Sequence, residues 1–174
     1  MSLGCLEFNT CPTGSPPEGF NASDSHLNYV NAFPVNSVRF GIQTLSPKFF
    51  GGAPDFVVSG PNVGIEFVNA LLAAGPPFLP PGTSVNVNYP LSTSSSCTSP
   101  SDFSFILTRI APSNSATDVE TCGTDHLPRE TAVVATNGCF ASVSVMNATT
   151  KTDVNATTQA FVLGHLGNFL SCLS

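Results

Sequence analysis

The residues best suited to chemistry stand in a glycine-rich segment, Ser59-Gly-Pro-Asn-Val-Gly64. Within it, Asn62 carries an amide oxygen that can bind a hard cation or hold a phosphate. Ser59, Gly60 and Gly64 add a small hydroxyl and backbone N–H groups, which are the donors of a phosphate-binding loop. The same residue types are also typical of a plain turn. The pattern alone therefore leaves a binding loop and a simple turn both open.

Two aspartate–histidine pairs, Asp24-Ser-His26 and Asp125-His126, are further candidates. A histidine beside a carboxylate can act as a general base or as a metal ligand. The alternative is that both pairs are solvated in polar loops, because proximity in sequence is not geometry. His165 is expected in the last helix, partly buried or at the surface. No serine has the sequence context of a hydrolase nucleophile.

A strand and a helix would have to position the glycine-rich segment. Pro54–Ser59 has an apolar centre bounded by proline and glycine, which predicts a short buried strand of a parallel sheet. The loop after it would lie at the carboxyl edge of the sheet, where open α/β sheets bind ligands. Residues 65–75 show helical spacing and predict the following helix. Asp55, the nearest acid, would sit at the opposite end of the strand from Asn62.

Other elements follow from proline positions and hydrophobic periodicity. Pro34 can begin a helix that continues through Val38, Ile42 and Leu45 and ends at Pro47. Residues 1–28 are rich in turn-forming types and are expected to be loop. Strands are predicted at 84–89, 103–110, 131–135 and 139–145, and a C-terminal helix is predicted at 155–173.

These elements predict an α/β fold in a single domain over residues 1–174. Its parts would be a disulfide-bearing loop over 1–28, an α/β core over 29–90, and C-terminal strands and a helix over 91–174. The length of 174 residues suits one domain.

The composition indicates a folded protein with few charges. Hydrophobic residues make up 41% of the chain and charged residues 9%, which argues against disorder. The net charge of −6 disfavours nucleic-acid polymers and anionic membranes as partners. A phosphate can still bind if a cation lies between it and the protein. No stretch has the length of a membrane span.

Six dispersed cysteines predict disulfides and an oxidising compartment. Pairing of nearest neighbours would give Cys5–Cys11, Cys97–Cys122 and Cys139–Cys172. The spacing permits other pairings. Six buried free thiols are the alternative to disulfides.

Three N-x-[ST] acceptors, at Asn21, Asn147 and Asn155, agree with a secreted glycoprotein. Residues 1–5 have neither the basic nor the apolar region of a signal peptide. We therefore expect that a leader was removed or that an upstream segment is absent.

Several stretches resemble the secreted fungal branch of the SurE-like phosphatases and nucleotidases. The most specific is Pro54-Asp-Phe-Val-Val-Ser-Gly-Pro-Asn-Val-Gly64, which is similar to the family's "PD-hydrophobic-VVSG-x-N-x-G" signature. Ser84-Val-Asn-Val-Asn-Tyr-Pro90 resembles its "LNVN-aromatic-P" strand. Further similar stretches are Leu27–Asn31, Val38–Leu45, Glu120–Asp125, Gly138–Val145 and the C-terminal helix.

The resemblance implies a three-layer, Rossmann-like SurE-type sheet and metal-dependent hydrolysis of phosphomonoesters, typically nucleotides. The metal, Mg²⁺ or Mn²⁺, would activate water and neutralise the phosphate. In the family it is held by an Asp-Asp pair, by a Ser or Asn, and by the Asn of the "SG-x-N" loop. The last of these corresponds to Asn62. The resemblance also implies an oligomer, and we expect a homodimer.

Two departures from the family pattern bear on activity. The sequence contains no Asp-Asp pair, and Gly64 runs directly into Ile65-Glu-Phe-Val, without the segment that shapes the family's phosphate pocket. The SurE-type sheet is therefore expected to be incomplete. One amide oxygen does not hold a divalent ion usefully. We therefore expect lost or impaired catalysis, and the alternative is a non-catalytic secreted binding protein.

Overall fold

The computed structural model describes residues 13–60, 65–90, 97–111 and 116–173. The chain divides into two compact units, Met1–Ser59 and Gly60–Ser174. Each is described by itself below. The assignment of 1–174 to one domain stays a prediction.

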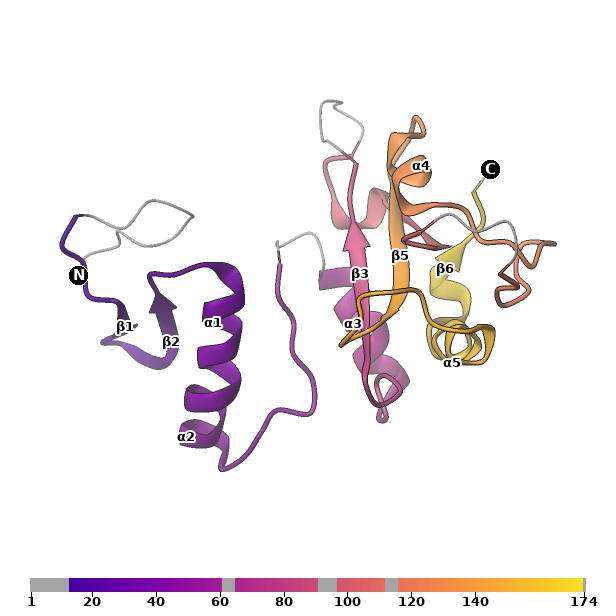
Figure 1. Ribbon diagram of the computed structural model, residues 1–174. Helices are drawn as coiled ribbons and strands as arrows, with labels where there is room; N and C mark the ends of the chain where they lie inside the picture. Colours follow the sequence, from indigo (N-terminus) through magenta and orange to yellow (C-terminus); the bar gives the residue numbers. More distant parts are fainter. Residues whose placement is uncertain (1–12, 61–64, 91–96, 112–115, 174) are drawn as a thin grey trace. The chain divides into compact units, whose positions relative to one another are not determined.

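The first unit contains a β-hairpin and a bent helix (Figure 1). Strands β1 (Glu18–Asn21) and β2 (Asp24–Val30) pair antiparallel, with a bulge at Phe20/Asn21. The expectation of loop over 1–28 is therefore wrong for residues 18–28. Paired strands satisfy each other's backbone groups, so a polar segment can form a hairpin without a buried face.

The bent helix begins at Pro34, as predicted, but it does not end at Pro47. Helix α1 (Pro34–Phe40) continues through a π-helical turn (Gly41–Leu45) into α2 (Ser46–Phe50). Pro47 lies in the first turn of α2, directly after the π-helical turn. The helix ends at Gly51, whose φ of 77° is left-handed.

The second unit is built on a four-stranded mixed sheet of order β3-β5-β4-β6. Strand β3 (Thr83–Asn88) pairs antiparallel with β5 (Phe140–Asn147). Strand β4 (Ser104–Thr108) pairs parallel with β5 and with the short β6 (Leu170–Ser171). The predictions at 84–89, 103–110 and 139–145 are thus confirmed.

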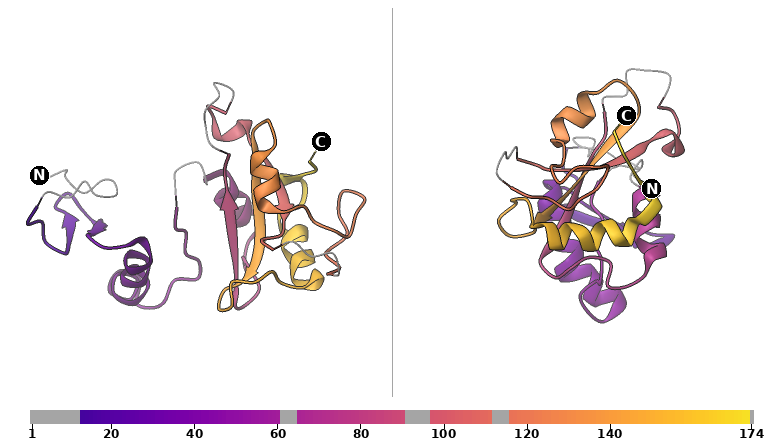
Figure 2. Two further views of the ribbon diagram at one scale, coloured as in Figure 1. Left: turned by 45° about the horizontal axis from the view of Figure 1, so that its top comes forward. Right: turned by 90° about the vertical axis from the view of Figure 1, so that its right-hand side faces the viewer.

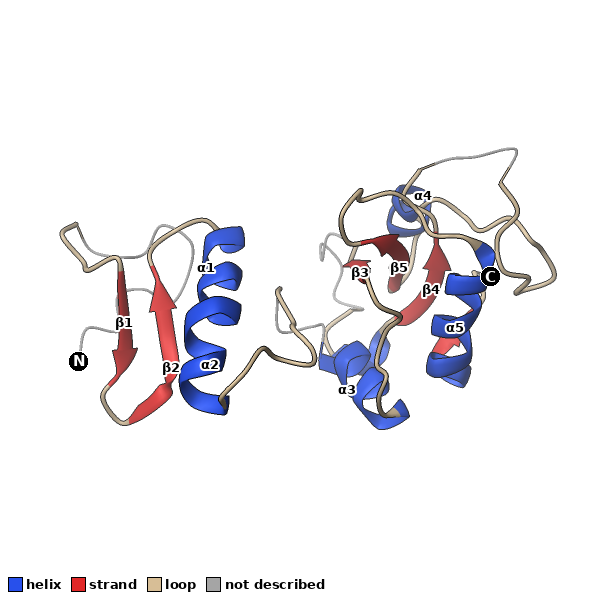
Figure 3. Ribbon diagram, turned by 60° about the horizontal axis from the view of Figure 1, so that its bottom comes forward, coloured by secondary structure: helices blue, strands red, loops and turns tan. Residues whose placement is uncertain are grey.

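Helices lie on both faces of this sheet (Figure 3). Helix α3 (Ile65–Ala74), predicted over 65–75, packs Phe67 against Phe105 of β4, with ring centroids 6.2 Å apart. Helix α5 (Ala156–Leu166) lies on the same face and contacts both α3 and β5 (Figure 2). The predicted C-terminal helix is confirmed, but it ends at Leu166 instead of 173. The α/β prediction is also confirmed.

Helix α4 (Glu130–Ala135) contacts the opposite face of the sheet, through β4 and β5. The prediction of a strand at 131–135 is wrong. The valines and the threonine there favour strands only weakly, and the tertiary contact of α4 with the sheet outweighs that preference. Val133, fully buried, anchors the helix.

The core of the second unit lies between the sheet and helices α3 and α5. Odd-numbered residues of β5 supply three of its fully buried side chains, and Leu71 and Val162 supply the helical side. The β5 members are Ala141, Val143 and Val145. The period-2 alternation of this strand therefore sorts apolar residues to one face and serines to the other.

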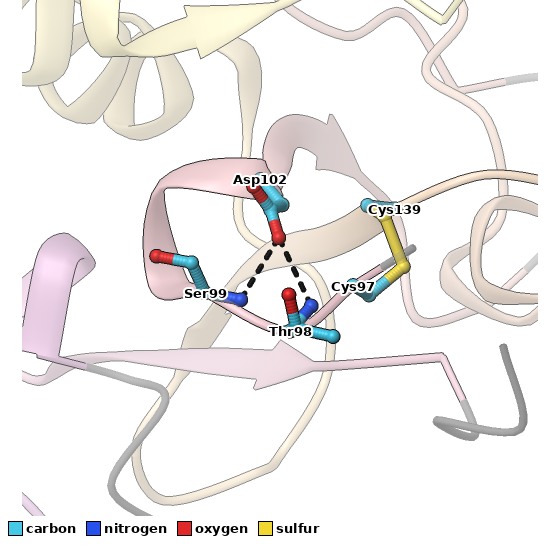
Figure 4. The surroundings of a disulfide bond; sticks show 5 residues. All are labelled: Cys97, Thr98, Ser99, Asp102 and Cys139. Carbon is cyan, nitrogen blue, oxygen red and sulfur yellow. Dashed lines mark hydrogen bonds between the residues drawn. A yellow bond between two sulfur atoms is a disulfide. The ribbon is translucent and has the colours of Figure 1, made fainter. Parts of the chain in front are cut away.

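Two disulfides differ from the predicted pairing. Cys97 is bonded to Cys139 (Figure 4), and Cys122 is bonded to Cys172. The starts of β4 and β5 lie side by side, and Ser104 donates its N–H to the carbonyl of Cys139 at 2.8 Å. This contact brings the segment before β4 to Cys139. Pairing by sequence order could not anticipate it. The predicted Cys5–Cys11 bond lies outside the described residues.

Candidate functional site

The glycine-rich segment does not follow a strand. Residues 54–59 form no strand, and Val57 and Val58 are 42% and 56% exposed. The predicted buried strand is therefore wrong. A buried parallel strand needs a paired neighbour, and the sheet of the second unit takes its strands from other segments.

Of the predicted binding residues, Ser59 and Gly60 are exposed. Asn62 and Gly64 lie outside the described residues. Asp55 is exposed too and forms no part of a site with Ser59 in the described chain. The metal and phosphate roles of this loop stay predictions.

A polar cluster that the sequence did not single out lies on the α4 face of the sheet. The carboxylate Oε2 of Glu130 accepts hydrogen bonds from Nδ2 of Asn86 at 3.0 Å and from Nδ2 of Asn88 at 3.1 Å. It also accepts from Oγ of Ser144 at 3.1 Å, and that hydroxyl lies 2.8 Å from Oγ1 of Thr108. These donors come from β3, β5 and β4.

The strand register explains this cluster. Ser144 of β5 has a paired residue on each neighbouring strand, Asn86 of β3 and Thr108 of β4. Paired residues point to the same face of a sheet, so one face becomes polar across three strands. The sequence signal for this polar face was the alternation of polar and apolar residues in Ser84–Tyr89, because residues two apart on a strand share a face. Every donor to Glu130 is a neutral amide or hydroxyl.

A second buried network centres on Asp118. Its carboxylate forms an ion pair with Arg109 and accepts from Nε2 of Gln159 at 2.8 Å and from the N–H of Leu127 at 3.0 Å. Asp153 lies 3.5 Å from the same guanidinium. Buried carboxylates satisfied in this way hold loops in place, so this network is structural.

The two aspartate–histidine pairs both form. Nδ1 of His26 lies 3.3 Å from Oδ1 of Asp24, and Nδ1 of His126 lies 2.6 Å from Oδ1 of Asp125. The hydrogen bond from His126 lowers the pKa of the Asp125 carboxyl below its ordinary value. Both pairs are about half exposed. They lie in different units, so the structure does not place them at one site.

His165 is half-buried, as expected. Its Nε2 lies 3.2 Å from the carbonyl oxygen of Gly75, which follows α3. This contact links α5 to the end of α3. The residue therefore has a packing role in the described chain.

The described residues do not fit a divalent metal. Among them, no group of three His, Cys, Asp or Glu side chains lies close enough together to hold an ion. Asp118 and Asp153 are committed to Arg109, and Glu130 stands alone among neutral donors. Mg²⁺ and Mn²⁺ need several oxygen ligands, usually with carboxylates.

The three glycosylation candidates are all exposed. The side-chain Oδ1 atoms accept backbone N–H groups: Asn21 from Ser23, and Asn155 from Thr158 at the start of α5. Asn147 accepts from Thr149 and Thr150 in the same manner. In the described part of the chain, no helix is long and apolar enough to span a membrane.

Comparison with known proteins gives one informative match. Over 59 residues the chain is 39% identical to a Yarrowia lipolytica protein named acid phosphatase, and this stretch covers 33% of the chain. It spans 16% of the length of that protein. No family model and no solved structure matches. A third of the chain is thus similar to part of a protein named acid phosphatase.

Proposed function

We propose that this chain is a SurE-like phosphatase relative whose own metal-dependent hydrolysis of phosphomonoesters is lost or impaired. The observation that carries the proposal is the 59-residue similarity to an acid phosphatase. The motif Pro54–Gly64 and the strand Thr83–Asn88 support the SurE-like assignment by their resemblance to that family.

The proposed impairment follows from the available ligands. A phosphomonoesterase of this type uses Mg²⁺ or Mn²⁺ to activate water and to neutralise the phosphate. In this chain Asn62 would be the ligand retained, and the sequence offers no Asp-Asp pair to join it. The described carboxylates do not gather into a substitute site.

A non-catalytic secreted binding protein on the same scaffold is the second candidate. Its support is the combination of two disulfides with three exposed N-x-[ST] acceptors, which suits an extracellular protein. Expression through a eukaryotic secretory pathway should give glycans at Asn21, Asn147 and Asn155. Mass loss on treatment with peptide-N-glycosidase would show them, and an unchanged mass would count against secretion as a glycoprotein.

A phosphatase assay tests whether catalysis is lost. The oxidised chain would be incubated with 4-nitrophenyl phosphate and with a nucleoside monophosphate, each with Mg²⁺, with Mn²⁺ and with chelator. We expect no turnover above the blank. Turnover that disappears with chelator and in Asn62→Ala would show an active hydrolase, and Asn69→Ala, at an exposed helical position, is the matched control.

The expected homodimer also stays a proposal. Its support is the number of large apolar side chains left exposed in the first unit: Phe20, Leu27, Phe33, Val35, Phe50, Val57 and Val58. Such surface on a soluble protein is often covered by a partner. Sedimentation equilibrium at micromolar concentration should report twice the chain mass, and a monomer would contradict it.

A further inference from the structure

A cavity of about 380 Å³ lies within the second unit, between β4, the end of α5, β6 and the segment 121–128. Its lining includes the apolar residues Leu107, Leu163 and Leu170. The volume falls within the range of small-molecule sites. The Glu130 cluster, Ser59 and Gly60 are not among its described lining residues.

A tight turn forms one wall of the cavity. Thr121 and Thr124 exchange two backbone hydrogen bonds of 3.0 Å, and Cys122 and Gly123 between them have φ of 55° and 76°. Both values are left-handed, as in a type I′ turn. The Cys122–Cys172 disulfide ties this turn to the segment after β6. The wall is therefore fixed covalently as well as by hydrogen bonds.

His126 lines the same cavity and is held in a defined orientation. Its backbone N–H donates to Oγ1 of Thr124 at 3.1 Å, and its Nδ1 lies 2.6 Å from the carboxylate of Asp125. A carboxylate on Nδ1 keeps the proton there and leaves Nε2 of the neutral ring as an acceptor. Among the hydrogen bonds of the described residues, Nε2 of His126 has no partner.

We propose that this cavity binds a small neutral molecule with an apolar body and a hydroxyl group, of the phenol type. The body would lie against the leucines, and the hydroxyl would donate to Nε2 of His126. A neutral ligand meets no repulsion from the net charge of −6. This proposal does not rest on the proposed function, so each can fail independently.

The other aspartate–histidine pair provides a matched control. His26 is similarly exposed and also contacts an aspartate, Asp24, but its ring packs beside Phe49 with centroids 4.6 Å apart. It is not among the residues that line the cavity. Replacing His26 therefore removes an equivalent exposed pair without touching the proposed site.

The experiment uses ¹⁹F NMR on the full oxidised chain with two probes, 4-fluorophenol and 4-fluorotoluene, which differ in the hydroxyl. We expect 4-fluorophenol to bind with a Kd on the order of 1 mM, a value typical of a small fragment. His126→Ala should weaken this binding about fivefold, the worth of one hydrogen bond. His26→Ala should leave it unchanged, and 4-fluorotoluene should be insensitive to both substitutions.

Three results would overturn the proposal. The first is the absence of 4-fluorophenol binding up to about 10 mM, well beyond the expected Kd. The second is equal affinity for the two probes, which would show an apolar cavity without use of His126. The third is equal weakening by His26→Ala and His126→Ala. His126 is half exposed, so circular dichroism should show both variants folded.

Discussion

Residues 13–59 and the described part of 60–174 have similar patterns of apolar residues. They differ in how far they bury the apolar side chains. The described part of the second unit buries twelve apolar side chains. Within residues 13–59 the one buried residue is Ser46, and the large apolar residues are half-buried or exposed. Hydrophobic periodicity therefore gives helices in both units, but a core forms only where strands bring distant segments together.

The largest expected difference between the units concerns a buried charge. Asp118→Ala leaves Arg109 without its main partner and frees the N–H of Leu127, so we expect a loss of about 4 kcal/mol in unfolding free energy. The control Asp55→Ala removes an exposed acid of the first unit and should cost almost nothing. Urea denaturation followed by circular dichroism measures both. Equal losses would contradict the structural role of the Asp118 network.

A core truncation tests the same contrast with apolar residues. Leu71→Ala removes a fully buried side chain of α3 and should cost about 3 kcal/mol. Val35→Ala, at a position 73% exposed in α1, should change the unfolding free energy by less than about 0.5 kcal/mol when the chain is diluted to a monomer. A comparable cost at both positions under that condition would mean that the first unit has a core of its own.

The polar face of the sheet provides a smaller effect. Glu130→Ala leaves the side chains of Asn86, Asn88 and Ser144 without their shared acceptor, and we expect a cost of about 2 kcal/mol. Glu18→Ala, at an exposed position of β1, is the matched control and should be neutral. The readout is again the midpoint of urea unfolding. A neutral Glu130→Ala would show that water replaces the carboxylate without cost.

The smallest effect is the pH dependence of an exposed pair. The hydrogen bond from His126 lowers the pKa of Asp125 in the folded chain, so the ionised carboxylate is favoured there. This contribution to stability is present above the pKa of the unfolded chain and is lost as the pH falls through the lower, folded value. Carbon-13 NMR of the Asp125 carboxyl should titrate below its ordinary range. His126→Ala should move it back up, and an unmoved titration would contradict the assigned cause.

Local elements of the fold could be predicted from sequence, whereas long-range pairings could not. Capping residues and periodicity predict two helix starts, at Pro34 and residue 65. They also predict the strands at 84–89 and 139–145. The Cys97–Cys139 bond depends on β4 lying beside β5, which no local pattern encodes.

The same limit explains the errors around the candidate site. Pro54–Ser59 has the composition of a buried strand, but a strand also needs neighbours, and the sheet offers it none. The role of Glu130 was missed because two of its donors, Asn86 and Asn88, lie more than forty positions away in β3. Asn86 and Asn88 were recognised as part of an alternating strand, and only the register showed that their amides meet a carboxylate.

The boundary between the two units falls after Ser59, within the glycine-rich segment of the sequence that carries Asn62. The central claim is that this chain does not assemble a divalent-metal site on Asn62. Isothermal titration of the oxidised chain with Mn²⁺ tests this most directly. We predict no saturable binding up to about 1 mM, because a single amide oxygen with no gathered carboxylates is a poor site. Stoichiometric binding that Asn62→Ala abolishes would contradict the claim.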